Sequence, residues 1–112
     1  MRLIERPFGA AALFEQVRHG DRRGFFARTF RRAVLAAEGI EVEVVQADLS
    51  FGAERHTLRG LHLQRGQRAE IEIVQCVTGA LFDVIVDPRP ASPSFCRWQG
   101  HASFAPELLG AA

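Results

Sequence analysis

A chain of 112 residues is long enough for one domain and too short for two of ordinary size. Its residues are 47% hydrophobic and 24% charged with a formal net charge of +1, which excludes a disordered chain and gives no support to nucleic-acid binding. All 14 basic residues are arginine and there is no tyrosine, so this chain has no lysine amine for Schiff-base chemistry and no phenol for proton transfer.

The N-terminal residues, the lack of a long apolar stretch and the cysteine pattern predict a cytoplasmic protein. The first eight residues lack the apolar run of a signal peptide. No stretch approaches the roughly 18 apolar residues that a membrane helix needs, so we expect no membrane association. Cys76 and Cys96 form neither a CxxC pair nor a disulfide framework, and we expect both thiols to be free.

The first half of the chain predicts short strands and one short helix. Residues 12–17 read as a strand that ends at a turn around Gly20. Residues 28–38 predict a helix, because Gly39 stands where a helix C-terminal glycine belongs. Apolar and acidic residues then alternate over 40–44, which is typical of a half-buried strand.

The second half predicts a β-hairpin and further strands. A polar loop over 48–57 leads into a strand over 57–64 and a turn at Gly66. Strands over 70–77 and 80–86 flank a tight turn and predict an antiparallel hairpin. Its expected core face consists of Phe82, Val84 and Val86. Short strands with glycine and proline turns favour a β-sandwich or barrel, with one more strand expected within 101–104.

A basic cluster begins after the predicted first strand and extends into the predicted helix. Its members are either a solvated surface or an anion site, because guanidinium groups bind phosphate oxygens in pairs, and both interpretations remain open. They are Arg18, His19, Arg22, Arg23, Arg28, Arg31 and Arg32.

The residues 57–64 carry the best candidates for chemistry. In a strand, His62 and Gln64 lie on one face, and Gly60 permits the close approach of backbone or ligand. Arg59 is out of phase with His62 unless a bulge at Gly60 re-aims it. A histidine beside an arginine suits a general base near neutral pH, and the alternative is a structural histidine.

A metal site at the same strand is a further alternative to a general base. His62, Gln64 and Glu70 loosely resemble the His-x-His-x-x-x-x-Glu metal site of β-barrels. An amide replaces the second histidine, the glutamate comes one residue late, and amide oxygen is a poor ligand for transition metals. We therefore predict no metal.

Five ordered motifs within residues 20–98 resemble the dTDP-4-dehydrorhamnose 3,5-epimerase family. Each motif alone is weak, but all five in order are specific. They are GDRRGFF at 20–26 (family GDxRGFF), Gln46 with Ser50 (Q-x-N-x-S), LRGLHLQ at 58–64 (LRGLHxQ), residues 77–89 (V-x-G-x-x-FDVxVDxR) and residues 92–98 (SPTFGxW).

The resemblance implies an all-β, cupin-type jelly roll (a double-stranded β-helix) with one short helix, forming a homodimer without metal or cofactor. It implies that the enzyme removes a proton alpha to the C4 keto group of a dTDP-4-keto-6-deoxy sugar and returns it on the other face, in dTDP-rhamnose and polysaccharide biosynthesis. His62 would be the base, and Asp83 would support the site by a hydrogen bond. The substrate-binding residues would be Arg23, Phe26, Gln46, Ser50, Arg59 and Gln64.

Several positions depart from the family pattern. Asp48 replaces an asparagine, Arg28 replaces an acidic residue, and Glu72 aligns with a lysine expected to stabilise the enolate. The family's AHGF segment, tyrosine acid and histidine-orienting aspartate have no counterpart in residues 1–112. We therefore expect a truncated single domain, impaired or inactive by itself. The alternative is a non-catalytic nucleotide-sugar-binding or assembly module derived from the family.

Overall fold

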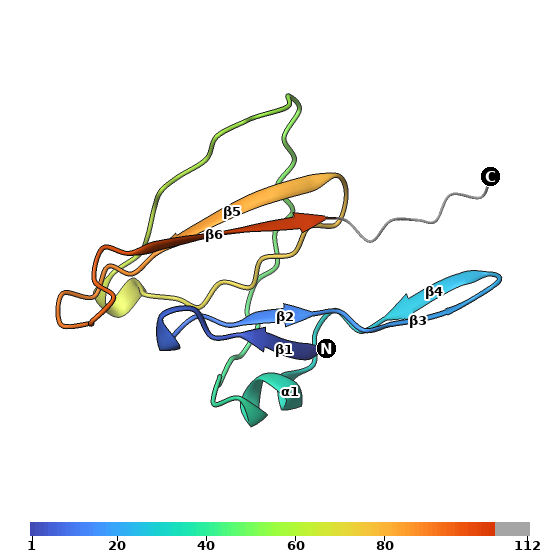
Figure 1. Cartoon of the computed structure of the whole chain (residues 1–112), viewed down its shortest axis with the longest axis horizontal. Coiled ribbons are helices and arrows are strands. Elements are labelled where there is room, and N and C mark those ends of the chain that lie inside the picture. Colours follow the sequence, from blue (N-terminus) through green and yellow to red (C-terminus); the bar gives the residue numbers. More distant parts are fainter. Residues whose placement is uncertain (105–112) are drawn as a thin grey trace.

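The structure is a computed structural model that describes residues 1–104, and these residues form mostly strands with little helix (Figure 1). Three antiparallel pairs join β1 with β2, β3 with β4, and β5 with β6. The elements are β1 Arg2–Glu5, the 3-10 turn η1 Pro7–Gly9, β2 Leu13–Glu15, β3 Arg18–Asp21, β4 Gly24–Ala27, α1 Arg32–Ala37, the 3-10 turn η2 Gly66–Arg68, β5 Ala80–Val86 and β6 Trp98–Phe104. No helix among the described residues has the length and apolar character to cross a bilayer.

The β3–β4 hairpin projects from the rest of the chain as a narrow arm (Figure 1). The turn expected around Gly20 is wrong, because that residue lies within β3 and the chain reverses after Asp21. The Asp21 carboxylate accepts the backbone N–H of Arg23 at 2.8 Å and its guanidinium at 2.6 Å. These hydrogen bonds from Arg23 to the Asp21 side chain close the turn after Asp21, and not around Gly20 as predicted.

The helix is confirmed but is shorter than residues 28–38, since α1 covers six residues. Its end at Gly39 is as predicted, because that glycine has φ +74. The N–H of Gly39 donates to the Ala36 carbonyl at 3.0 Å, and the N–H of Ile40 donates to the Leu35 carbonyl at 2.9 Å. These two bonds form a Schellman motif, which satisfies carbonyl groups at the helix end.

The predicted hairpin of 70–77 with 80–86 is wrong in its pairing. Residues 80–86 do form β5, but β5 pairs with β6 along its whole length, from Ala80 opposite Phe104 to Val86 opposite Trp98. Within residues 1–104, the segments 40–44, 57–64 and 70–77 have no strand partner. A strand exists only where a neighbour accepts and donates its main-chain hydrogen bonds, and sequence alternation alone does not supply that neighbour.

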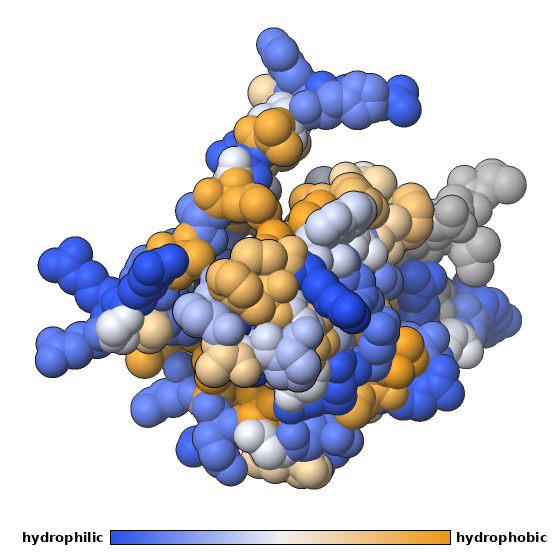
Figure 2. Space-filling model, turned by 60° about the vertical axis from the view of Figure 1, so that its left-hand side comes forward, coloured by the Kyte–Doolittle hydropathy of each residue, from blue (hydrophilic) through white to orange (hydrophobic). Residues whose placement is uncertain are grey.

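The described residues bury few side chains. Three of them are buried, namely Pro7, Leu35 and Asp87. The predicted core face on β5 is wrong, since Phe82 is 65% exposed and Val84 is half-buried. Figure 2 shows apolar side chains uncovered in several patches of the visible face, among polar ones. Cys76 and Cys96 are free thiols, as predicted.

Asp87 is the centre of a hydrogen-bonded polar cluster. Its carboxylate accepts Arg89 Nε at 2.8 Å and the hydroxyls of Ser92 and Ser94 at 2.6 Å each. The Arg89 guanidinium also donates to the carbonyl of Phe8 at 3.0 Å. The cluster therefore closes the connection between β5 and β6 and attaches it to the turn after β1.

The hydrogen bonds from Arg89, Ser92 and Ser94 hold the pKa of the Asp87 carboxyl well below its ordinary value. Because the pKa is lower in the folded chain than its unfolded value of about 3.9, the ionised carboxylate stabilises the fold at pH values above that value. This stabilisation is lost as the pH falls below the unfolded pKa. We predict that the protection factor of the Cys96 amide, which donates to the Asp87 carbonyl at 2.8 Å, stays constant from about pH 8 to 5 and declines below about pH 4. Hydrogen exchange read by NMR measures it.

Asp21→Asn is the matched control for Asp87→Asn. Both aspartates pair with an arginine two residues later, but the side chain of Asp21 is 51% exposed and that of Asp87 is 1% exposed. Asp87→Asn should lower the Cys96 protection factor at neutral pH and remove its acid-dependent decline, because the buried hydrogen bonds are lost. Equal losses in the two variants would contradict a special role for the buried cluster.

Candidate functional site

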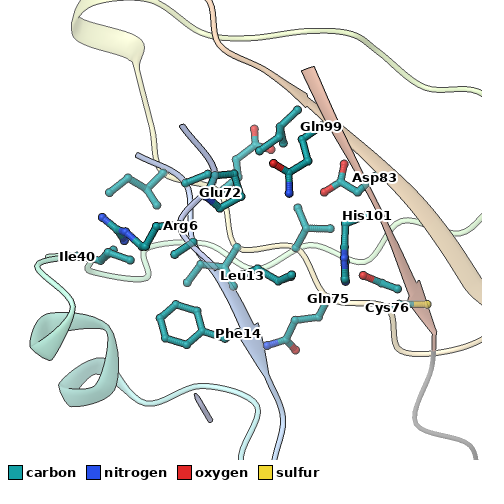
Figure 3. A pocket seen from close by; sticks show the side chains of 18 of the residues that line it. Arg6, Leu13, Phe14, Ile40, Glu72, Gln75, Cys76, Asp83, Gln99 and His101 are labelled. Atoms are coloured by element: carbon teal, nitrogen blue, oxygen red, sulfur yellow. The ribbon is translucent and has the colours of Figure 1, made fainter. Parts of the chain in front are cut away.

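The described residues line an open cleft of about 1790 Å³ (Figure 3). Its walls come from the β1–β2 pair, the β5–β6 pair, and the unpaired residues 59–63 and 71–76. Gln99 on β6 donates its amide to the Glu5 carboxylate on β1 at 3.0 Å, and so joins two of these walls. The cleft is therefore assembled from segments that are distant in the sequence.

Arg59 and His62 both line this cleft. The sequence placed them on opposite faces of a strand, but residues 57–64 do not form one, and the expected alternation does not apply. The Arg59 guanidinium donates one hydrogen bond to the carbonyl of Phe51 at 3.1 Å. That bond orients the side chain and uses one of its five N–H groups, so the others remain able to bind an anion.

Gly60 controls how closely the chain approaches His62. Its φ is +90, a conformation that glycine adopts without strain. A Cβ built on Gly60 would lie 3.2 Å from His62 Nδ1, which is tighter than an ordinary contact. The absence of a side chain at residue 60 therefore leaves room for the imidazole, as the sequence suggested for a close approach at this glycine.

The cleft carries charges of both signs. Asp83 on β5 lines it, directly opposite His101 on β6, and Glu72 lines it from an unpaired segment (Figure 3). Arg6 also lines the cleft, and its Nη1 is buried without a hydrogen-bond partner in the described part of the chain. The carboxylate of Glu72 thus lies in the same cleft as the two groups that the sequence predicted for the chemistry.

Sequence reasoning missed the contributions of Gln75, Gln99 and His101 to the cleft. Gln99 and His101 are two residues apart on β6, so they lie on the same face of the strand. The alternation of side chains along this strand was the sequence signal that could have identified both residues. The side chain of Gln75 donates to the Thr29 carbonyl at 2.5 Å, a contact that no local pattern predicts.

The remaining predicted site residues lie away from the cleft. Arg23 is at the tip of the β3–β4 arm, where its guanidinium holds the pKa of Asp21 below its ordinary value. Phe26 on β4 lines a small hollow of about 250 Å³. Gln46 donates to the Asp48 carboxylate at 2.6 Å. Ser50 and Gln64 are exposed outside the cleft, and the roles of all five residues stay predictions.

Metal-binding side chains do not gather in the described part of the chain. No three or more of its histidine, cysteine, aspartate and glutamate side chains are arranged to hold a metal ion, including those around His62 and Glu70. The cleft instead offers an imidazole, a guanidinium and a carboxylate. This set can accept a proton and bind an anion, which suits chemistry on a negatively charged substrate.

Comparison with known proteins gives one consistent result. Residues 6–103 match the family model described as dTDP-4-dehydrorhamnose 3,5-epimerase. The enzyme of that name from Shigella flexneri is 41% identical over 101 residues, covering 89% of this chain and 55% of the relative. That from Pseudomonas aeruginosa is 45% identical over 89 residues, covering 79% of this chain and 48% of the relative.

A solved structure agrees in fold as well as in sequence. The crystal structure of dTDP-4-dehydrorhamnose 3,5-epimerase from Bacillus anthracis, which has TDP and PPi bound, matches with a TM-score of 0.89 and 39% identity. The match covers 96% of this chain and 61% of that one. The chain spans about half the length of the curated relatives it matches.

We predict that Gly60→Ala displaces the His62 imidazole, because the new methyl group would crowd Nδ1. The ring signals of His62 in a histidine-edited NMR spectrum should shift. Gly66→Ala is the matched control, since Gly66 also has positive φ (+63) but has nothing within 4 Å of its Cβ. Similar shifts of the His62 signals in both variants would show that backbone strain, rather than crowding, moves the ring.

Proposed function

Because the chain belongs to the dTDP-4-dehydrorhamnose 3,5-epimerase family, we propose that it binds a dTDP-4-keto-6-deoxy sugar and carries the base of the epimerisation. The observation that supports this most is the presence of Arg59 and His62 in one cleft. The TDP and PPi bound to the solved relative support a nucleotide diphosphate as the ligand class.

In the proposed reaction, neutral His62 removes the proton alpha to the C4 keto group. The electron pair of the broken C–H bond moves onto the carbonyl oxygen, which becomes an enolate. A guanidinium in the cleft, that of Arg59, stabilises this charge or binds the diphosphate. Return of a proton to the same carbon from the opposite face inverts its configuration, and this step needs a second proton donor.

We propose that Arg23, Phe26, Gln46, Ser50 and Gln64 contact the nucleotide part of the substrate. Arg23 and Phe26 lie on the β3–β4 arm, which projects away from the body of the chain (Figure 1). An arm of this kind can reach the cleft of a second copy, and this supports a homodimer. Asp83 lines the cleft and could hold a substrate hydroxyl or a catalytic group by hydrogen bonding.

The chain by itself is proposed to be a single cupin-type jelly-roll domain of the cytoplasm. By family it belongs to dTDP-rhamnose and polysaccharide biosynthesis, and its own catalysis is proposed to be impaired or absent. Glu72 lines the same cleft as His62, and a negative charge close to an enolate would disfavour that intermediate. The absence of tyrosine and lysine removes two common proton donors. Glu72 also supports the second candidate, a non-catalytic nucleotide-sugar-binding module.

We predict that Arg59→Ala weakens dTDP binding by about 1 kcal/mol or more, roughly fivefold in Kd, because a charged hydrogen bond to the diphosphate is lost. Isothermal titration calorimetry measures this. Arg65→Ala removes the same charge six residues later from an exposed residue outside the cleft, and it should leave Kd within about twofold. Equal affinity of the wild type and Arg59→Ala would exclude this role of Arg59.

We predict that the 112-residue chain catalyses negligible exchange of the C3 and C5 protons of dTDP-4-keto-6-deoxyglucose for deuterium in D2O. NMR measures this exchange. Glu72→Lys should raise the exchange rate at least about tenfold, because a cation replaces an anion near the enolate. Glu70→Lys changes the net charge equally, but Glu70 does not line the cleft, and the rate should not rise. Rapid wild-type exchange that His62→Ala abolishes would contradict the predicted impairment.

A further inference from the structure

The structure divides the basic cluster of residues 18–32 by the partners of its members. The Arg23 guanidinium pairs with the Asp21 carboxylate at 2.6 Å. The Arg18 guanidinium lies 5.0 Å from the centre of the Phe25 ring, which is a cation–π contact. Within residues 1–104, the other members of the cluster form no ion pair with a carboxylate. They are His19, Arg22, Arg28, Arg31 and Arg32.

Three of these unpaired members line one small hollow of about 250 Å³, which we call the arginine hollow. His19 belongs to β3, Arg28 directly follows β4, and Arg31 directly precedes α1. The other residues that line the hollow are apolar, so no acidic side chain of the described chain lines it. These apolar residues are Met1, Val17, Phe26 and Val34. The arginine hollow therefore gathers basic groups from three segments without a carboxylate to balance them.

Strand alternation in the β3–β4 arm accounts for this grouping. His19 stands directly opposite Phe26 in the strand register, so their side chains lie on the same face of the arm. Arg28 follows Phe26 by two residues and continues that face past the end of β4. Arg18 and Phe25 are each one residue out of phase with this pair, and their cation–π contact lies on the other face. The arm thus separates the partnered arginine from the unpartnered basic groups.

The electrostatics of the arginine hollow favour an anion. Arg28 and Arg31 carry like charges, and their apolar surroundings screen the repulsion less than water does. Guanidinium groups donate hydrogen bonds and accept none, so the two arginines cannot bind each other. An oxyanion removes the repulsion and accepts hydrogen bonds from both, and the His19 ring offers a further N–H.

We propose that the arginine hollow is a binding site for a phosphate-type oxyanion, with Arg28 and Arg31 as the main donors. Its volume is several times the roughly 30 Å³ that one water molecule occupies, which suits a tetrahedral anion. Guanidinium forks match the spacing of phosphate oxygens. Neither Arg59 nor His62 lines the hollow, so this inference does not rest on the proposed function.

The phosphate group can come from free phosphate or from a nucleotide, and the test separates these sources. The 112-residue chain is titrated at constant ionic strength in sodium chloride with inorganic phosphate, dTDP or thymidine, and NMR follows the arginine side-chain N–H signals. Phosphate should shift the signals of Arg28 and Arg31 saturably, with a Kd of about 1 mM or tighter. Thymidine, which has no phosphate group, should not shift them. Tighter binding of dTDP than of phosphate would identify a nucleotide as the source, and equal or weaker binding would identify free phosphate.

Arg31→Gln should weaken phosphate binding at least about tenfold, because it removes one of the two charged donors. Arg28→Gln should have an effect of the same size and provides a second, independent variant. Arg22→Gln is the matched control, since Arg22 belongs to the same basic cluster and is exposed but does not line the hollow. It removes the same charge and should change the Kd by less than about twofold.

Three results would overturn the proposal. They are the absence of saturable shifts at Arg28 and Arg31, equal losses of affinity in Arg22→Gln and Arg31→Gln, and equal shifts with thymidine and with phosphate. The second result would show that diffuse surface charge attracts the anion, and the third that the nucleoside binds without its phosphate. Equal dTDP affinity of the wild type and Arg59→Ala would instead count against the proposed function and leave phosphate binding in the arginine hollow in place.

Discussion

Main-chain hydrogen bonding is the constraint on which the rest of this structure depends. Segments with a strand neighbour, such as β5 and β6, are regular over seven residues each. Segments with an equally good strand sequence but no neighbour within residues 1–104 remain irregular, as residues 70–77 show. Because a sheet buries side chains only when its strands are assembled, the same constraint explains why so few residues of the described chain are buried.

The cleft is lined in part by these unpaired segments. Arg59 and His62 lie on an unpaired segment, so their directions are set by local contacts and not by strand alternation. The hydrogen bond from Arg59 to the Phe51 carbonyl and the free space over Gly60 are two such contacts. The cleft carries charges of both signs, since Glu72 lines it together with Arg59.

Two copies of one local motif show how tertiary context changes the role of a sequence. Asp21 with Arg23 and Asp87 with Arg89 are both aspartate–arginine pairs two residues apart. Asp21 only closes an exposed turn. Asp87 is 2% exposed and also binds two serine hydroxyls, while its arginine reaches the carbonyl of Phe8. Burial and added partners, not the motif itself, make the second pair a structural centre.

The sequence by itself determined the family, the all-β character, the short helix with its glycine end, and the candidates Arg59 and His62. Each of these features depends on residues that are close together in the sequence, through their spacing, through a backbone conformation that glycine favours, or through a short motif. Only the tertiary structure decided that β5 pairs with β6, that Phe82 is exposed, and that Gln99 and His101 join the cleft. Those outcomes depend on contacts between residues far apart in the chain, and local alternation gives the face of a strand but not its partner.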